Sequence, residues 1–333
     1  MKLLIVKLSS LGDVVHAMAA VQDICVALGS AKDGLEIDWV VERAFAPLVR
    51  RCAGVGRVIE CEIRRWRKQW WRGQTRREWK VFLAQLRAQD YDAVIDLQGL
   101  IKSALVARLA RLRPGGTRYG LANRTEGSSF EAPARWLANV SIRIEPHTHA
   151  VQRGRELCAK ALGYELSGPP RFGLQESFDD SRSTPKPQTF VLFAHGASRA
   201  DKLWPEEHWM ELGTRLIQEG FKVALAHGTP EEEARSQRIA RALGKQASAW
   251  PRMELDALLD QMAQARGVIG VDSGLSHIAM ALDLPHVQIY NFDTAWRTGP
   301  LGHEHQRSLV AASPPQPLPV DDVWAAWLEA VRA

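Results

Sequence analysis

The chain has 333 residues, 43 Lys and Arg against 38 Asp and Glu, and 46% apolar residues. This length suits two domains of about 150 residues each, and the apolar fraction excludes a disordered chain. Positive charge is concentrated in residues 1–175, which hold 28 Lys and Arg against 17 Asp and Glu, whereas residues 176–333 hold 15 against 21. We therefore expect the first half to attract an anionic partner.

The sequence also argues against membrane-spanning and secreted classes. We find no apolar run of about 18 residues, which predicts no spanning helix, and the N-terminus begins like a strand rather than a signal peptide. The four cysteines form no C-x-x-C pair and no Cys/His cluster, so we expect reduced thiols of a cytosolic protein without a metal role. They are Cys25, Cys52, Cys61 and Cys158.

Strand-like apolar runs alternate with helical patterns along the first half. Strands are predicted at 2–8, 36–41, 57–61 and 91–97, and helices at 13–28, 75–89 and 100–110. Alternation of this kind predicts a parallel sheet that is covered by helices.

A segment rich in Pro, Ser and charge interrupts the alternation. We predict a first domain over 1–167, a linker over 168–188, a second domain over 189–319 and a terminal helix over 320–333. Within the second half, strands are predicted at 189–195, 222–227, 267–271 and 286–291, and helices at 205–219, 230–243, 254–265 and from 273 onward. Two open α/β domains predict a cleft between them, with ligands at the carboxyl ends of the strands.

Three loops at strand ends of the second half are suited to a nucleotide diphosphate. H-G-A-S-R-A-D-K (195–202) offers backbone amides, the Ser198 hydroxyl and the Lys202 cation. An acid within 227–233 is suited to a ribose diol, and V-D-S-G-L-S-H (271–277) lets backbone amides approach an anion. Each loop alone is more readily explained as an ordinary turn with a helix cap, but three at successive strand ends favour a nucleotide site.

The stretch 64–80 holds eight Lys and Arg, one acid and four of the twelve tryptophans. Arg presents a planar fork that fits carboxylate or phosphate oxygens, and Trp favours the level of lipid headgroups. Two alternatives stay open, namely a solvated basic helix and a surface for single-stranded nucleic acid.

The loop K-L-S-S-L-G-D-V-V-H (7–16) places Asp13 in the first turn of a predicted helix. There the helix dipole stabilises a charged carboxylate. An ionised carboxylate is the general base that a hydroxyl needs when it attacks a sugar whose leaving group is a diphosphate. The alternative is that Asp13 only stabilises the start of the helix.

Five motifs together resemble the lipopolysaccharide heptosyltransferases of glycosyltransferase family 9, in order and over nearly the whole chain. They are K-x-S-S-L-G-D-V-V-H, R-R-W-R-K, D-L-Q-G-L-I-K-S (96–103), D-K-x-W-P-E-E-H-W (201–209) and V-D-S-G-L-S-H. The R-R-W-R-K motif points to the branch that adds the first heptose.

The resemblance implies a GT-B fold: two Rossmann-like domains, with the C-terminal helix crossing back toward the first. It implies transfer of L-glycero-D-manno-heptose from ADP-heptose to Kdo of Kdo2-lipid A, with inversion and with neither metal nor cofactor. A cytoplasmic protein bound peripherally to the inner membrane, with no nucleic-acid partner, fits that activity. Two alternatives remain. One is a family member that uses a different core acceptor, such as heptosyltransferase II, and the other is a nucleotide-dependent nucleic-acid-binding protein.

The resemblance also implies roles for individual residues. Asp13 would be the general base, and the donor would be bound by Ser198, Lys202, Glu232, Asp272, Ser273, Gly274 and His277. The acceptor's carboxylates and phosphates would be bound by Arg64, Arg67, Lys68 and Arg124. Two departures from the family pattern are Ala197–Ser198, in place of two threonines, and N-F-D-T-A-W (291–296), which leaves the role of Thr294 open. The choice among Glu231, Glu232 and Glu233 for the ribose is open as well.

Overall fold

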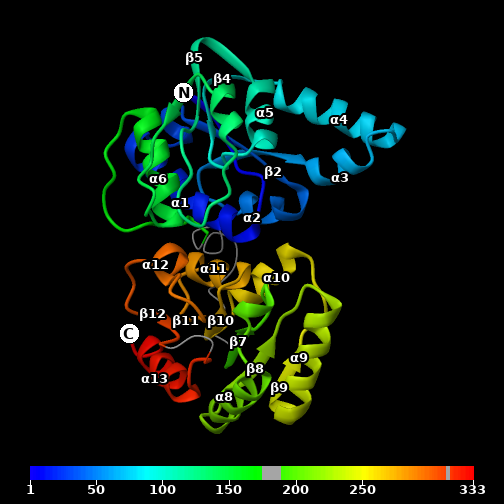
Figure 1. Ribbon diagram of the computed structural model, residues 1–333, viewed down its shortest axis with the longest axis vertical. Helices are drawn as coiled ribbons and strands as arrows, with labels where there is room; N and C mark the ends of the chain where they lie inside the picture. Colours follow the sequence, from blue (N-terminus) through cyan, green and yellow to red (C-terminus); the bar gives the residue numbers. More distant parts are fainter. Residues whose placement is uncertain (175–188, 313–315) are drawn as a thin grey trace. The chain divides into compact units, whose positions relative to one another are not determined.

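The computed structural model describes residues 1–174, 189–312 and 316–333, and the chain divides into two compact units, Met1–Ser177 and Phe178–Ala333. Each unit contains a six-stranded parallel sheet with helices packed against it (Figure 1). The fold class predicted from the sequence, two Rossmann-like parallel-sheet domains, is confirmed. Most of the predicted linker lies outside the described residues, and the predicted domain limits stay predictions.

The sheet of the first unit has the strand order β3-β2-β1-β4-β5-β6. Its strands are β1 (Lys2–Val6), β2 (Glu36–Glu42), β3 (Val55–Cys61), β4 (Asp90–Asp96), β5 (Arg111–Leu121) and β6 (Val140–Ile142). Its helices are α1 (Leu11–Leu28), α2 (Ala46–Arg50), α3 (Ile63–Lys68), α4 (Gly73–Leu86), α5 (Ile101–Leu109) and α6 (Ala150–Leu162). The order reverses between β1 and β4, and open α/β sheets bind ligands at such a reversal, beyond the carboxyl ends of the strands.

The second unit repeats this topology with the order β12-β11-β10-β7-β8-β9. Its strands are β7 (Phe190–Ala194), β8 (Lys222–Leu225), β9 (Ala247–Ala249), β10 (Gly267–Val271), β11 (His286–Tyr290) and β12 (Gln306–Val310). Its helices are α8 (Glu206–Gln218), α9 (Pro230–Leu243), α10 (Leu255–Met262), α11 (Gly274–Ala281), α12 (Ala295–Thr298) and α13 (Val320–Ala330). Here the reversal lies between β7 and β10, so the loops after these two strands are neighbours.

Tryptophans fill the core of the second unit. Trp204 and Trp209 of the D-K-x-W-P-E-E-H-W motif are buried and meet edge to face, with ring centroids 5.0 Å apart. Trp204 donates from Nε1 to the carbonyl of Leu318, 2.9 Å away, just before α13. Because Trp327 of α13 belongs to the same core, the terminal helix packs on the second unit. That it also crosses toward the first unit stays a prediction.

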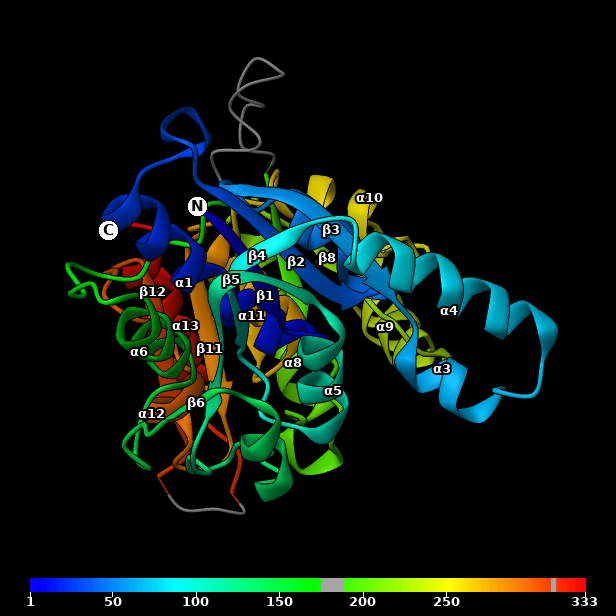
Figure 2. The same ribbon diagram turned by 90° about the horizontal axis from the view of Figure 1, so that it is seen from above.

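The basic stretch 64–80 forms most of a hairpin of α3 and α4 that projects from the sheet of the first unit (Figure 2). Two of its tryptophans have a packing role. Trp66 is buried, stacks edge to face on Trp79 with centroids 5.7 Å apart, and donates from Nε1 to Glu78. Trp70 and Trp71 at the turn are 54% and 72% exposed. The alternative that the whole stretch is a solvated basic helix is therefore wrong for Trp66 and Trp79, which pack against each other.

The sequence predicted no segment that is long and apolar enough to cross a membrane, and helix α1 contradicts that prediction. Among the described residues, it alone meets that condition by length and composition, because Asp13 and Asp23 are its only charged residues. Ten of its 18 residues are buried, and it packs against α6. This burial is what a core helix of a globular unit shows.

A buried ion pair joins α1 to α6. The Arg155 guanidinium, 4% exposed, donates from Nε and Nη2 to the Asp23 carboxylate at 2.7 and 3.1 Å, and also to the Gly168 carbonyl. Removing one partner of such a pair leaves an uncompensated buried charge.

We therefore expect Arg155→Ala to lower the free energy of unfolding of the first unit by about 3 kcal/mol. Urea denaturation followed by circular dichroism measures this change, with the exposed Arg143→Ala as the matched control. Equal stability of the two variants would contradict the structural role of the pair.

Candidate functional site

The loop between β1 and α1 lies at the strand-order reversal of the first unit. Asp13 occupies the third position of α1 and forms a capping box with Ser10. The Ser10 backbone N–H and hydroxyl donate to Asp13 Oδ2 at 3.2 and 2.8 Å. One carboxylate oxygen of Asp13, Oδ2, therefore stabilises the start of the helix. The other oxygen, Oδ1, accepts neither of these hydrogen bonds.

Two cations face that second oxygen. Lys7 Nζ lies 3.4 Å and Arg153 Nη2 lies 3.8 Å from Asp13 Oδ1. Both cationic side chains are largely buried, whereas that of Asp13 is 39% exposed. Solvent and solutes can therefore reach the carboxylate while its cations are fixed by the fold.

The electrostatics of this group keep Asp13 ionised. Burial alone would raise the pKa of Asp13, but the charges of Lys7, His16 and Arg153 and the hydrogen bond from Ser10 outweigh it. The pKa of Asp13 is held well below its usual range. Burial lowers the pKa of Lys7, and the Asp13 charge opposes that shift.

The turn after β4 is built by Asp96, to which the sequence analysis gave no role. Asp96 accepts hydrogen bonds from the Gln98 backbone and the Ser103 hydroxyl, both at 2.9 Å, and burial raises its pKa to about 6. Gln98 Oε1 in turn accepts from the Leu8 backbone N–H at 2.8 Å. The D-L-Q-G-L-I-K-S motif thus ties the turn after β4 to the loop that carries Asp13.

One predicted acceptor-binding residue of α3, Arg64, reaches the same loop. Arg64 donates from Nη2 to the Ser9 hydroxyl at 3.1 Å. Lys102, at the start of α5, has its pKa lowered by burial and by the charges of Arg64 and Arg67. The sequence analysis missed Lys102, although it stands in a motif directly after a strand.

Two further predicted acceptor-binding residues, Arg124 and Lys68, are exposed. Arg124 is exposed in the loop after β5 and donates from Nε to the Ser128 carbonyl at 3.1 Å. This loop connects to Asp13 through Arg153, which donates from Nη1 to Thr125 at 3.0 Å. Lys68 ends α3 and is exposed.

In the second unit, Asp272 connects two predicted donor-binding residues. Its Oδ2 lies 2.5 Å from Lys202 Nζ, its Oδ1 lies 3.3 Å from His277 Nε2, and Thr298 donates to Oδ1 at 3.4 Å. Burial alone would raise the pKa of Asp272, but His277 and Lys202 outweigh it and hold that pKa well below its usual range. The structure thus brings Lys202, Asp272 and His277 together.

A pocket opens beside this trio. It is lined by Arg199, Lys202, Asp272, Ile289, Tyr290, Asn291, Phe292, Thr294 and Arg297. Thr294 of the divergent loop after β11 is therefore part of the same pocket as Lys202. Asn291 holds the two loops together by donating from Nδ2 to the carbonyls of Asp201 and Leu203 at 2.8 and 3.0 Å.

The remaining donor-binding candidates lie in neighbouring loops. Ser198 is exposed in the loop after β7, and Ser273 caps α11, which begins at Gly274, by accepting from the Ser276 N–H at 3.4 Å. Glu232 accepts from the Gly228 backbone at 2.7 Å in the capping box of α9. A Cβ added to Gly196 would come within 2.4 Å of Glu232 Oε1. Of the three consecutive acids, the structure places Glu232 against the loop that carries Ser198.

We expect Lys7→Met to raise the pKa of Asp13, because it removes the nearest charge that stabilises the carboxylate. A ¹³C NMR titration of the Asp13 carboxyl group measures the shift. Lys80→Met, which removes an exposed lysine of α4, should leave that titration unchanged. An unchanged Asp13 titration in Lys7→Met would contradict this electrostatic account.

Comparisons with known proteins show the family to which the chain belongs. The profile of glycosyltransferase family 9 (heptosyltransferase) matches residues 79–318. Lipopolysaccharide heptosyltransferase 1 of Escherichia coli strain K12 is 41% identical over 294 residues, which cover 87% of this chain and 88% of that protein. The predicted family resemblance is confirmed.

Solved structures give the same result over almost the full length. The structure of E. coli heptosyltransferase WaaC with ADP is similar at a TM-score of 0.87 and 36% identity, covering 99% of this chain and 100% of that one. The structure of E. coli WaaC with ADP-2-deoxy-2-fluoro heptose is similar at a TM-score of 0.80 and 36% identity, covering 97% and 98%.

Proposed function

Since the chain belongs to glycosyltransferase family 9, the heptosyltransferases, we propose that it transfers L-glycero-D-manno-heptose from ADP-heptose to Kdo of Kdo2-lipid A in the synthesis of the lipopolysaccharide inner core. The donor is supported by the similarity to proteins solved with ADP and with an ADP-heptose analogue. The observation that carries the chemistry is Asp13, an ionised, solvent-accessible carboxylate with cations fixed beside it.

Asp13 acts as the general base of a direct displacement. The acceptor hydroxyl oxygen forms a bond to the anomeric carbon of heptose, the bond from that carbon to the diphosphate breaks, and ADP leaves with the electron pair. The hydroxyl proton passes to Asp13 Oδ1, since Oδ2 caps α1. A carboxylate with a lowered pKa is a weak base, so proton transfer accompanies formation of the new bond. One base and one displacement invert the anomeric configuration.

The second unit binds the donor in this proposal. Lys202, the Ser198 hydroxyl and the N-terminus of α11 at Ser273 and Gly274 face the diphosphate and stabilise the charge that develops on the leaving group. Asp272 positions Lys202 through an ion pair, and His277 Nε2 lies 3.3 Å from the other oxygen of the same carboxylate. Glu232 binds the ribose hydroxyls beside Gly196.

The first unit binds the anionic acceptor. Arg64, Arg67, Lys68 and Arg124 carry the forks and charges that recognise Kdo carboxylates and lipid A phosphates, and Lys102 joins them. Arg64 contacts the loop that carries Asp13, which favours placing the acceptor sugar next to the base.

The alternative acceptors separate in one experiment. The enzyme is incubated with ADP-heptose and either Kdo2-lipid A or an acceptor that already carries a heptose, and the products are weighed by mass spectrometry. A gain of one heptose on Kdo2-lipid A is expected. A gain of heptose only on the heptosylated acceptor would favour the heptosyltransferase II activity. Salt-dependent binding of single-stranded RNA, without heptose transfer, would favour the nucleic-acid-binding alternative.

We expect Asp13→Asn to lower kcat by roughly 10²–10⁴-fold, as loss of a general base does, while ADP-heptose binds with unchanged affinity. Steady-state kinetics and isothermal titration calorimetry measure the two quantities. The chain offers a matched control, Asp33→Asn, because Asp33 accepts from the Ser30 N–H and hydroxyl at 2.9 and 3.0 Å in the same type of capping box. Full activity of Asp13→Asn would overturn the assignment.

We also propose that the protein binds peripherally to the cytoplasmic face of the inner membrane through the turn of the α3–α4 hairpin. Trp70 and Trp71 are exposed there, and cationic side chains surround them in both helices. Such a combination is suited to the interface of an anionic bilayer.

The double substitution Trp70→Ser/Trp71→Ser should weaken binding to anionic vesicles at least about tenfold, because burying each ring contributes roughly 1.5–3 kcal/mol. Co-sedimentation with phosphatidylglycerol vesicles measures the binding. Val26→Ser, which removes an exposed apolar side chain of α1, is the control. Equal binding of both variants would contradict insertion of the turn.

A further inference from the structure

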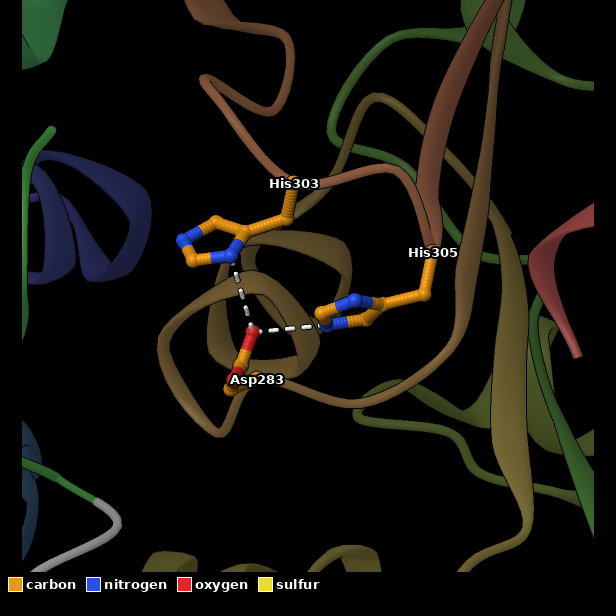
Figure 3. A group of neighbouring side chains, drawn as sticks. All are labelled: Asp283, His303 and His305. Atoms are coloured by element: carbon orange, nitrogen blue, oxygen red, sulfur yellow. Dashed lines mark hydrogen bonds and ion pairs between the residues drawn. The ribbon is translucent and has the colours of Figure 1, made fainter. Parts of the chain in front are cut away.

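A cluster of two histidines and one aspartate lies in the second unit, apart from the residues assigned to the reaction. Within the parts of the chain that the structure describes, Asp283, His303 and His305 form the one group of His, Cys, Asp or Glu whose potential ligand atoms all lie within 4.8 Å of one another. Both imidazole rings turn a nitrogen toward the Asp283 carboxylate (Figure 3). Two imidazoles and one carboxylate are a common ligand set for transition metals.

We propose that Asp283, His303 and His305 bind one divalent transition-metal ion of the Zn²⁺ class. His305 Nε2 and His303 Nδ1 lie 2.7 and 3.7 Å from Asp283 Oδ1. A tetrahedral ion with bonds of about 2.1 Å separates its ligand atoms by about 3.4 Å. The two separations from Asp283 Oδ1 bracket that value, and all three ligand atoms lie within 4.8 Å of one another, so small shifts of the side chains bring them to the spacing that the ion requires.

The backbone around the cluster fixes these side chains. Asp283 stands just after α11 in the left-handed region, at φ 54°, a conformation that Asp and Asn tolerate better than most residues. The His305 carbonyl accepts from the His286 N–H at 2.9 Å at the start of β11. Gln306 is buried and donates from Nε2 to the Met280 carbonyl at 3.2 Å. The turn at Asp283 and the start of β12 are therefore held together before any ion binds.

All three side chains are partly exposed, with 35% for His303, 23% for His305 and 39% for Asp283. An ion can reach them from solvent, and water can complete a tetrahedral shell beside the three protein ligands. Metal binding requires neutral imidazoles, so affinity falls as the pH is lowered.

The position of the cluster separates it from the donor-binding residues. Asp283 precedes β11, and His303 and His305 precede or adjoin the start of β12, so the cluster lies at the amino-terminal edge of a parallel sheet. Lys202, Asp272 and Thr294 follow β7, β10 and β11 at the opposite edge. A strand of five residues such as β11 spans about 16 Å between these edges. The ion therefore stabilises the second unit and takes no part in heptose transfer.

Metal titration of the tag-free, chelator-treated protein tests the site. Zn²⁺ is titrated by calorimetry, and Co²⁺ by visible absorption, which reports tetrahedral coordination. The wild-type protein should bind one equivalent, and Asp283→Asn and His305→Gln should each lower the affinity at least about tenfold. Asp283→Asn keeps a residue that tolerates the left-handed backbone, and His303→Gln gives the same test if that variant does not fold.

His147→Gln is the matched control, because His147 lies 3.0 Å from Glu126 on the first unit, and within the described residues this pair belongs to no group of three potential metal ligands. It should bind metal like the wild-type protein, and heptose transfer by Asp283→Asn should be unchanged. Absence of a saturable site in the wild-type protein, or equal loss of binding in His147→Gln and Asp283→Asn, would overturn the proposal.

Discussion

The ion pair between Asp13 and its two buried cations is the interaction on which the first unit is built. Lys7 directly follows β1, Asp13 lies in the first turn of α1 and Arg153 lies in α6, so a distant segment of the chain meets the loop between β1 and α1 at one carboxylate. Ser10 holds one oxygen of that carboxylate, and the cations face the other. The proposed acceptor residues connect to the same point, Arg64 through Ser9 and the loop of Arg124 through Thr125.

The two units use similar parts for different purposes. Both have the same strand order, and in both a lysine from one loop pairs with an aspartate at the reversal of the order, Lys7 with Asp13 and Lys202 with Asp272. The difference is exposure, since the Asp272 side chain is 6% exposed and that of Asp13 is 39% exposed. A buried aspartate can only orient its cationic partner, whereas an exposed one can take a proton from a substrate.

Sequence reasoning predicted the regular alternation well because strands such as β1 and β10 are nearly continuous apolar runs. It missed α6, because Arg153 and Arg155 are buried there by ion pairs with Asp13 and Asp23 and so interrupt the apolar pattern. It missed β5, because Pro114, Gly115 and Gly116 read as a turn inside an otherwise polar segment. Arg153 was consequently absent from the predicted site, whereas Lys202, Asp272 and His277 stand in loops after recognisable strands, and the structure brings these three residues together.

The proposed heptose transfer depends on one carboxylate that accepts the acceptor's proton during one displacement at the anomeric carbon. The most direct test is the configuration of the new glycosidic bond, read from the one-bond C–H coupling at the anomeric carbon of the product by NMR. We predict a configuration opposite to that of the ADP-heptose donor, because one displacement at the anomeric carbon inverts its configuration. The same configuration as the donor would require a covalent or ion-pair intermediate on the protein and would contradict the role given to Asp13.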